Sequence, residues 1–241
     1  MYINNYTYSH LKGMNINMEQ NDSTKKLWES VLNTVSKETI EIGPYFTNEI
    51  KNDIQHLMIT LARYKFAARI IGDNPKKNVL ELGCNEGLGT LSLAQVAAKT
   101  LAVDFDSKSI AWAKKNLSNS KLEYICDDFL GKNFGKFDAV VSIDVIEHID
   151  KKKEQLFVST LAQNLNDEGV SIVGTPNITA SSYASEGSKI GHINLYDSQR
   201  LKELFLKHFK NVFLFGMNDE VIHTGFAPMA HYLFVVACNK R

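Results

Sequence analysis

The stretch Val79-Leu80-Glu81-Leu82-Gly83-Cys84-Asn85-Glu86-Gly87-Leu88-Gly89-Thr90 decides how the rest of the chain is interpreted. A short apolar run with an acid near its end predicts a buried strand, and the glycines that follow predict a tight turn. Beyond the turn, Leu88, Leu91 and Ala94 recur at helical spacing. Together these elements predict a cradle for a nucleotide-like cofactor, because glycines let the backbone approach a ligand and a helix N-terminus offers it free N–H groups.

Composition limits the classes of function. The 241 residues carry 27 basic and 27 acidic side chains, so the net charge is zero. This balance argues against DNA as a partner, because binding to long nucleic acid depends on neutralising phosphates. The three cysteines have no metal or redox spacing, which predicts reduced thiols and a cytoplasmic protein. No apolar stretch approaches the roughly 20 residues of a membrane span, so we expect no membrane partner.

Apolar spacing predicts two regions. Residues 1–72 are expected to form an N-terminal cap or lid, with one helix near 24–35 and another at about 50–71, whereas residues 1–22 show no clear period. In residues 73–241, strands are expected at 78–82, 100–103, 122–126, 139–143, 170–173, 212–215 and 233–237, and helices at about 88–98, 107–117, 147–165 and 198–208. This alternation predicts an α/β fold with an open, doubly wound, mostly parallel sheet.

The glycine spacing separates two kinds of cofactor site. It does not fit the dinucleotide fingerprint G-x-G-x-x-G, which argues against an NAD-dependent dehydrogenase. It resembles motif I of the class I S-adenosylmethionine-dependent methyltransferases, E/D-x-G-x-G-x-G, with Asn85 at the second glycine. Asn is the non-glycine residue that best tolerates positive φ, so the turn remains feasible. The resemblance covers about residues 50–241 and implies a Rossmann-like sheet of seven strands whose last strand is antiparallel.

Acids at the ends of further strands fit the same family. Asp104 ends the second strand and can accept both ribose hydroxyls, while Asp106 is expected to cap the next helix. The segment Phe137-Asp138 with the apolar run that follows it resembles motif IV. The cofactor-binding residues that the resemblance and these positions imply are Glu81, Gly83, Cys84, Gly87, Asp104, Phe105, Asp127, Asp128, Ile143 and Tyr64.

A second cluster follows the fourth strand. Asp144, Glu147 and His148 have i, i+3 and i+4 spacing, so they share one face if the strand opens directly into a helix. With His192 they resemble the divalent-metal ligands of small-RNA 3′-terminal 2′-O-methyltransferases, and one alternative that this resemblance implies is a Mg²⁺ or Mn²⁺ site. The acid-x-x-Glu-His segment also occurs in ubiquinone-pathway O-methyltransferases. Without metal, Glu147 caps a helix, His148 binds a strand-end carbonyl, and His192 acts as general base. The expected catalytic residues are His192, Asp144 and His148.

We therefore expect an S-adenosylmethionine-dependent methyltransferase acting on a small hydroxylated metabolite, such as a sugar or a nucleotide-linked precursor of a surface glycan. Abundant Lys and Asn with few Arg indicate an AT-rich bacterial genome. Two alternatives remain at this point: a metal-dependent RNA 3′-end 2′-O-methyltransferase, and a cofactor-binding sensor that transfers no methyl group. The sequence leaves the acceptor, the methylated atom and the oligomeric state open.

Overall fold

The computed structural model describes residues 23–35, 39–72 and 76–241, so the first 22 residues lie outside the described part. The chain divides into two compact units, Met1–Ile40 and Glu41–Arg241. In the first unit, the expected helix is α1, Ser23–Leu32, and its apolar residues are exposed. The second unit holds the sheet together with the two helices that precede it. The predicted division at residue 72 stays a prediction.

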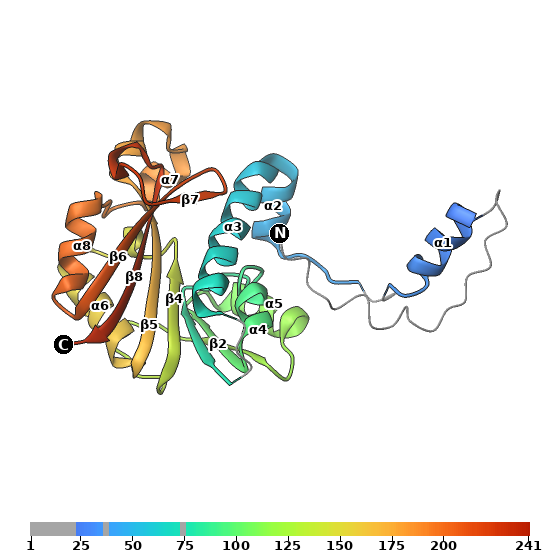
Figure 1. Cartoon of the computed structure of the whole chain (residues 1–241), viewed down its shortest axis with the longest axis horizontal. Coiled ribbons are helices and arrows are strands. Elements are labelled where there is room, and N and C mark those ends of the chain that lie inside the picture. Colours follow the sequence, from blue (N-terminus) through green and yellow to red (C-terminus); the bar gives the residue numbers. More distant parts are fainter. Residues whose placement is uncertain (1–22, 36–38, 73–75) are drawn as a thin grey trace. The chain divides into compact units, whose positions relative to one another are not determined.

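The second unit is built on one mixed sheet (Figure 1). Its strands are β1 Asn78–Leu82, β2 Lys99–Asp104, β3 Leu122–Cys126, β4 Phe137–Ile143, β5 Leu165–Pro176, β6 Phe209–Asn218, β7 Val221–His223 and β8 Tyr232–Lys240. They lie in the order β3-β2-β1-β4-β5-β8-β6-β7. The strands β1 to β5 are parallel, and β8 runs antiparallel between β5 and β6.

This topology confirms the predicted α/β class and the antiparallel last strand. The sheet has eight strands instead of seven, because β7 forms a short antiparallel pair with the end of β6. Three residues with mixed exposure give too short a pattern for a sequence to indicate a strand. Pairing with β6 creates β7, so it is a product of the tertiary structure.

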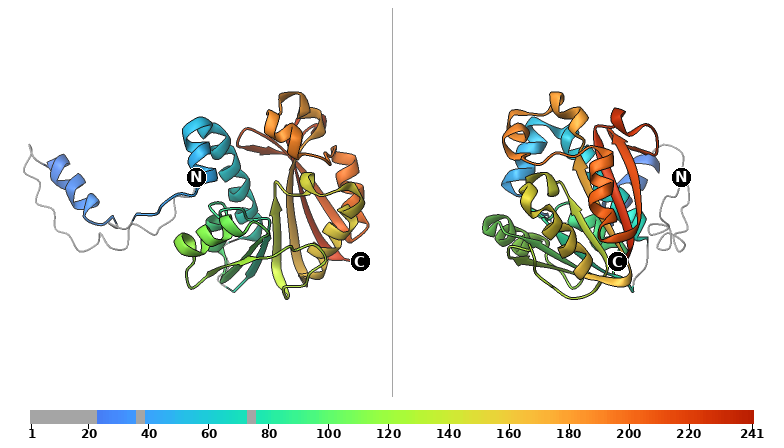
Figure 2. Two further views of the ribbon diagram at one scale, coloured as in Figure 1. Left: turned by 180° about the vertical axis from the view of Figure 1, so that it is seen from behind. Right: turned by 90° about the vertical axis from the view of Figure 1, so that its left-hand side faces the viewer.

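Helices cover both faces of the sheet (Figures 1 and 2). They are α2 Pro44–Asn52, α3 Ile54–Ile71, α4 Thr90–Val96, α5 Ser107–Leu117, α6 Glu154–Gln163, α7 Glu186–Gly191 and α8 Ser198–Leu206, with 3-10 turns η1 Ile146–His148, η2 Lys151–Lys153, η3 Ile178–Tyr183 and η4 Ala227–Met229. Apolar clusters place α3, α4 and α5 on one face and α6 and α8 on the other. As predicted, Asp106 caps α5 by accepting the N–H of Lys108 at 3.0 Å.

Two predicted helices differ from the structure. The expected helix at 50–71 is two helices, because Asp53 ends α2 and its side chain accepts the N–H of His56 at the start of α3. The expected helix at 147–165 is replaced by η1, η2 and a shorter α6. Here Asp150 caps a new turn by accepting the N–H of Lys152 at 2.7 Å. This local hydrogen bond interrupts the helix that the apolar spacing predicted to be continuous.

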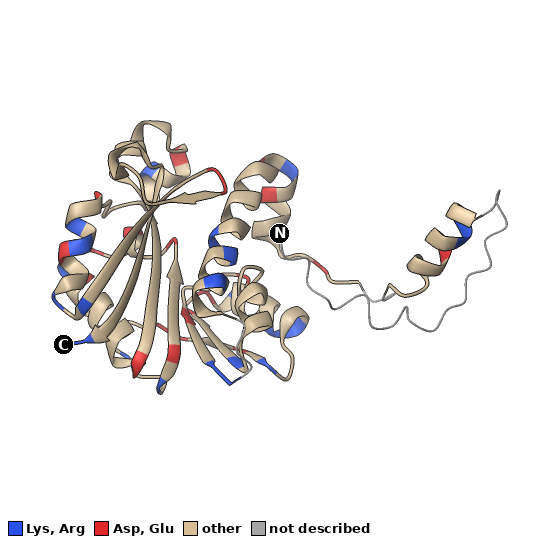
Figure 3. Ribbon diagram, viewed as in Figure 1, with Lys and Arg blue, Asp and Glu red and all other residues tan. Residues whose placement is uncertain are grey.

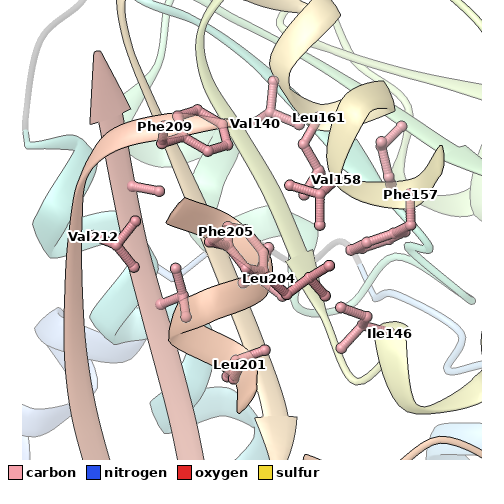
Figure 4. Close-up of a cluster of buried hydrophobic side chains, with 14 of the residues drawn as sticks. Val140, Ile146, Phe157, Val158, Leu161, Leu201, Leu204, Phe205, Phe209 and Val212 are labelled. Carbon is pink, nitrogen blue, oxygen red and sulfur yellow. The ribbon is translucent and has the colours of Figure 1, made fainter. Parts of the chain in front are cut away.

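The largest apolar core lies between the sheet and the pair α6–α8 (Figure 4). Phe157 and Leu161 of α6 and Leu201 and Phe205 of α8 all belong to this cluster, and all four side chains are fully buried. Because α6 follows β4 and α8 follows β5 along the chain, the first turns of both helices lie on the side of the sheet where the parallel strands end. This placement becomes important for the site.

Basic and acidic residues occur together along α8 (Figure 3). Within the described ranges, no helix combines the length and hydropathy that crossing a bilayer requires.

Candidate functional site

A cavity of about 1200 Å³ opens at the carboxyl ends of the parallel strands. This is where doubly wound sheets bind ligands. Its walls come from α2, the glycine turn, the β2–α5 junction, the loop after β3 and the loop after β4. The residues that line it are Pro44, Tyr45, Gly83, Asn85, Glu86, Asp104, Phe105, Asp106, Lys108, Ser109, Trp112, Asp128, Phe129, Leu130, Asp144, Val145, His148 and Ile149.

The glycine turn requires two of its glycines for steric reasons. Gly83 has φ of 85°, and a Cβ there would lie 2.3 Å from a methyl group of Val145. Gly87 has φ of 78°, and a Cβ there would collide with the ring of Tyr124. Asn85 adopts φ of 50°, so the residue that departs from the family motif does take the left-handed conformation. The backbone therefore forms the tight turn that the glycines predicted, and its role as a cofactor cradle stays a prediction.

Glu81 lies beneath this turn and is fully buried. Neither carboxylate oxygen has a hydrogen-bond partner of ordinary geometry in the described part of the chain. Burial raises the pKa of Glu81 to about 7, although the nearby hydroxyls of Thr90 and Tyr64 offset part of the effect. An unpartnered buried carboxyl group is costly. It fits a site completed by the ammonium group of a cofactor, directly or through water.

Asp104 organises the middle of the cavity. Its two carboxylate oxygens accept the backbone N–H groups of Asn85 at 2.8 Å and of Asp106 at 2.9 Å. The side chain thereby joins the glycine turn to the start of α5 while facing the cavity. Each carboxylate oxygen can accept two hydrogen bonds, so capacity remains for two ribose hydroxyls. The geometry fits the predicted role.

At the expected adenine end of the cavity, only one of the two predicted acids lines the wall. Phe105 is 75% exposed and lines the cavity, as does Asp128. Asp127, in contrast, forms an ion pair with Lys132 and is absent from the cavity wall. Trp112 of α5 also lines this end and was missed, although its spacing of three and four residues from Ser109 and Lys108, which share the same helical face and line the cavity, could have placed it there. Adenine contacts by Asp127 and Asp128 stay predictions.

The expected methyl end holds an ion pair. Asp144 lines the cavity and accepts a hydrogen bond from Arg63 of α3 at 2.6 Å. The Arg63 guanidinium also lies 4.0 Å from the ring centre of Tyr232. Asp144 has φ of 57°, so β4 does not open directly into a helix and the helical-face argument for Asp144, Glu147 and His148 is wrong. The left-handed residue redirects the chain, and η1 begins only at Ile146.

Three of the four candidate metal ligands do converge. Ligand atoms of Glu147, His148 and His192 all lie within 4.8 Å of one another. The two imidazole rings are 5.0 Å apart, centre to centre. Asp144 does not belong to this group in the described structure, since its carboxylate binds Arg63.

Burial determines the electrostatics of this cluster. Glu147 is fully buried; one oxygen accepts the hydroxyl of Thr175 at 3.0 Å, and the other has no partner among the described residues. Burial, with the charge of Asp144, raises the pKa of Glu147 to about 8. Burial and the neighbouring His148 lower the pKa of His192 below its usual value.

The remaining predicted residues support the cavity from behind. Cys84 and Ile143 are buried, and burial raises the pKa of the Cys84 thiol far above its usual range. Tyr64 is buried against Gly89, where a Cβ would lie 2.2 Å from its ring. None of these side chains is part of the cavity wall.

Glu86 is a wall residue that the sequence analysis did not single out. Its carboxylate accepts the N–H groups of Tyr45 at 2.8 Å and Phe46 at 3.2 Å, at the N-terminus of α2. This contact attaches the cap helix to the glycine turn. An acid between two motif glycines was the available signal.

Comparisons with known proteins agree with this geometry. A family profile described as "Methyltransferase domain" matches residues 53–209. The chain is 32% identical over 123 residues to the mitochondrial ubiquinone biosynthesis O-methyltransferase of Dictyostelium discoideum, a match covering 45% of this chain and 38% of that protein. The chain thus spans less than half the length of the curated relatives that it matches.

Solved structures share the fold at lower identity. The N-methyltransferase NodS from Bradyrhizobium japonicum, in complex with S-adenosyl-L-homocysteine, superposes with a TM-score of 0.54 at 16% identity, covering 77% of this chain and 86% of that one. The methyltransferase domain of bacterial CtHen1 gives a TM-score of 0.61 at 17% identity, covering 75% and 99%.

The family match includes β1 to β5, whose carboxyl ends carry the glycine turn, Asp104 and Asp144. On that basis the chain belongs to the methyltransferase domain family and shares the Rossmann-like fold of the solved methyltransferases.

Proposed function

We propose that this enzyme methylates a hydroxyl oxygen of a small metabolite and that His192 accepts the proton of that hydroxyl. The observation that carries the proposal is the imidazole pair His148–His192 beside Glu147. His148 lines the cavity, and the ring of His192 lies adjacent to it, 5.0 Å away centre to centre. An imidazole at that edge can accept a proton near neutral pH. The relatives named as O-methyltransferases support an oxygen acceptor.

S-adenosylmethionine supplies an already activated methyl group, so the protein must mainly bind, orient and deprotonate. In this proposal Asp104 binds the ribose hydroxyls, and Glu81 with the glycine turn holds the methionine end. Arg63 keeps Asp144 in place beside the reacting centre. His192 removes the acceptor proton.

A sugar or a nucleotide-linked precursor of a surface glycan is the acceptor class that we favour, in a bacterial cytoplasm. The cavity of about 1200 Å³ exceeds the ~300–1,000 Å³ typical of a single-ligand pocket. This volume supports a cofactor together with a small acceptor. A net charge of zero is a poor match to a long nucleic acid.

A second candidate involves a divalent metal such as Mg²⁺ or Mn²⁺. The convergence of Glu147, His148 and His192 supports it, as does the unpartnered buried oxygen of Glu147. These three residues would hold the ion, and its charge would bind and acidify acceptor hydroxyls. A carboxylate with two imidazoles also suits Mn²⁺, Fe²⁺ or Zn²⁺. An RNA 3′-end acceptor belongs to this candidate.

The test is methyl transfer from radiolabelled S-adenosylmethionine to a defined panel: free hexoses, UDP-hexoses, catechol and a short RNA duplex with free 3′ hydroxyls. Each reaction is run with EDTA and with added Mn²⁺. Label on a hexose or UDP-hexose in EDTA, lost in His192→Ala, is expected. Label on RNA that requires Mn²⁺ would favour the second candidate. Normal cofactor affinity without transfer to any acceptor would favour a sensor.

A further inference from the structure

His192 lies outside regular structure, in the segment 191–197, which consists of the last residue of α7 and the loop that leads to α8. Two hydrogen bonds attach this segment to the turn η1. The ring Nδ1 of His148 lies 2.9 Å from the carbonyl oxygen of Gly191, and the N–H of Asn194 donates to the carbonyl of Glu147 at 3.0 Å. The position of His192 relative to Glu147 and His148 therefore depends on what holds Asn194.

The side chain of Asn194 is buried and enclosed by polar groups. Its amide NH₂ donates to the hydroxyl of Tyr196 at 2.6 Å, and its carbonyl accepts Arg200 at 2.6 Å. Tyr196, which is fully buried, donates to the carboxylate of Glu154 at 3.0 Å. Every hydrogen-bonding atom of the Asn194 side chain thus has a protein partner.

An ion pair between two helices closes this network. Arg200 stands in the first turn of α8, and Glu154 is the first residue of α6. They meet at 2.5 Å, with the guanidinium stacked 4.1 Å from the ring centre of Tyr196. The same guanidinium donates to the carbonyl of Leu195 at 2.6 Å. One fork of donors therefore binds α6, the Asn194 side chain and the backbone of the segment at once.

This arrangement is more elaborate than packing two helices requires. The apolar contacts between α6 and α8 already join them, and a half-buried ion pair adds little stability of its own. What the pair does supply is orientation, because a planar guanidinium fixes directions that apolar contacts leave open.

The geometry assigns Arg200 and Glu154 as positioning residues that act through Asn194 to hold His192 against the Glu147–His148 turn. The assignment rests on the proposed role of His192, and neither residue touches the cavity. Displacement of a catalytic group by about 1 Å can reduce turnover by roughly 100-fold. Loss of the fork should therefore lower kcat while the cofactor site is unaffected.

The first measurement follows amide hydrogen exchange in the full chain. Arg200→Met keeps the apolar stem and removes the donors. We expect exchange in residues 191–197 to accelerate by tenfold or more, with the strands unchanged. Arg200→Lys restores the charge without the fork and should give an intermediate acceleration. Gln155→Met is the matched control: Gln155 binds His208 at 3.0 Å, linking α6 to the end of α8 without contacting the segment. Unchanged protection of 191–197 in Arg200→Met would overturn the assignment.

The second measurement is a double-mutant cycle with His192→Ala, using the panel acceptor of highest turnover. Arg200→Met alone should reduce kcat by about 10- to 100-fold, with S-adenosylhomocysteine affinity within twofold of wild type. When His192→Ala is already present, Arg200→Met should lower kcat by less than threefold. Equal losses in both backgrounds would show a merely structural role and reject the assignment. If Arg200→Met does not fold, Glu154→Gln enters the same cycle.

The turnover of His192→Ala alone tests the proposed function independently of the network around Arg200. His192→Ala with wild-type turnover would remove the role of His192, and with it the catalytic consequence of the network. The exchange measurement would still decide whether Arg200 holds the segment.

Discussion

The buried carboxyl group of Glu81 makes the stability of this protein depend on pH in a defined direction. Burial raises its pKa from the usual 4.5 to about 7. The folded protein therefore keeps a proton that the unfolded chain releases between these two values. The stabilising effect of this proton is fully present below pH 4.5 and is lost as the pH rises through 7.

The magnitude follows from the two pKa values. The two pKa values differ by about 2.5, and each pKa unit corresponds to ~1.4 kcal/mol. At high pH the free energy of unfolding is therefore lower by about 3 kcal/mol than at low pH. Between pH 5 and pH 8 the expected loss is about 2 to 3 kcal/mol, since the unfolded carboxyl is already partly ionised at pH 5. Glu81→Gln keeps the shape and removes the titration. Between pH 5 and pH 8 the free energy of unfolding of the variant should therefore fall by about 2 to 3 kcal/mol less than that of wild type.

Urea unfolding at pH 5 and pH 8 measures this double difference. Glu123→Gln, which alters an exposed carboxylate on β3, is the matched control and should follow wild type. Saturating S-adenosylhomocysteine should stabilise wild type more at pH 8 than at pH 5, because its ammonium group favours the ionised carboxyl. Parallel pH dependences for wild type and Glu81→Gln would refute the reasoning.

Three further outcomes are expected. Asp104→Ala should weaken S-adenosylhomocysteine binding by about 2 kcal/mol, roughly 30-fold, and should also destabilise the turn, because the Asn85 and Asp106 N–H groups lose their acceptor. Calorimetry showing unchanged affinity would contradict this expectation. His192→Ala should reduce turnover by about 10²- to 10⁴-fold and leave cofactor affinity near wild type, and a parallel loss of both would argue for a structural role. If the metal candidate holds, Glu147→Ala should abolish activity that depends on Mn²⁺ add-back while cofactor binding survives, and full activity in excess chelator would reject that candidate.

The local signals in the sequence were sufficient for the framework of the site. Strand-forming runs ending in Glu81, Asp104 and Asp144 gave the alternation of strands and helices, and the glycine positions gave the turn. These features depend on short-range backbone preferences, which a sequence carries in each segment. The left-handed conformation of Asn85 follows from the same kind of preference.

Contacts between distant segments were beyond the reach of that reasoning. The partner of Asp144 is Arg63, 81 residues away, and the partner of Glu154 is Arg200, 46 residues away. The i, i+3, i+4 spacing suggested a helical face, whereas the positive φ of Asp144 ended that register. A single residue in an unusual conformation can cancel a spacing argument, and its cost is met only by tertiary contacts.

The sequence by itself determined the class of fold, the glycine turn and the acids at the neighbouring strand ends, because these depend on periodicity and local conformation. The tertiary structure alone decided which side chains meet there. It joined Glu147, His148 and His192, drew Asp144 to Arg63, and placed the Arg200–Glu154 pair behind His192. The physical reason is that packing of α3, α6 and α8 on the sheet sets these distances, and no periodicity within one segment encodes them.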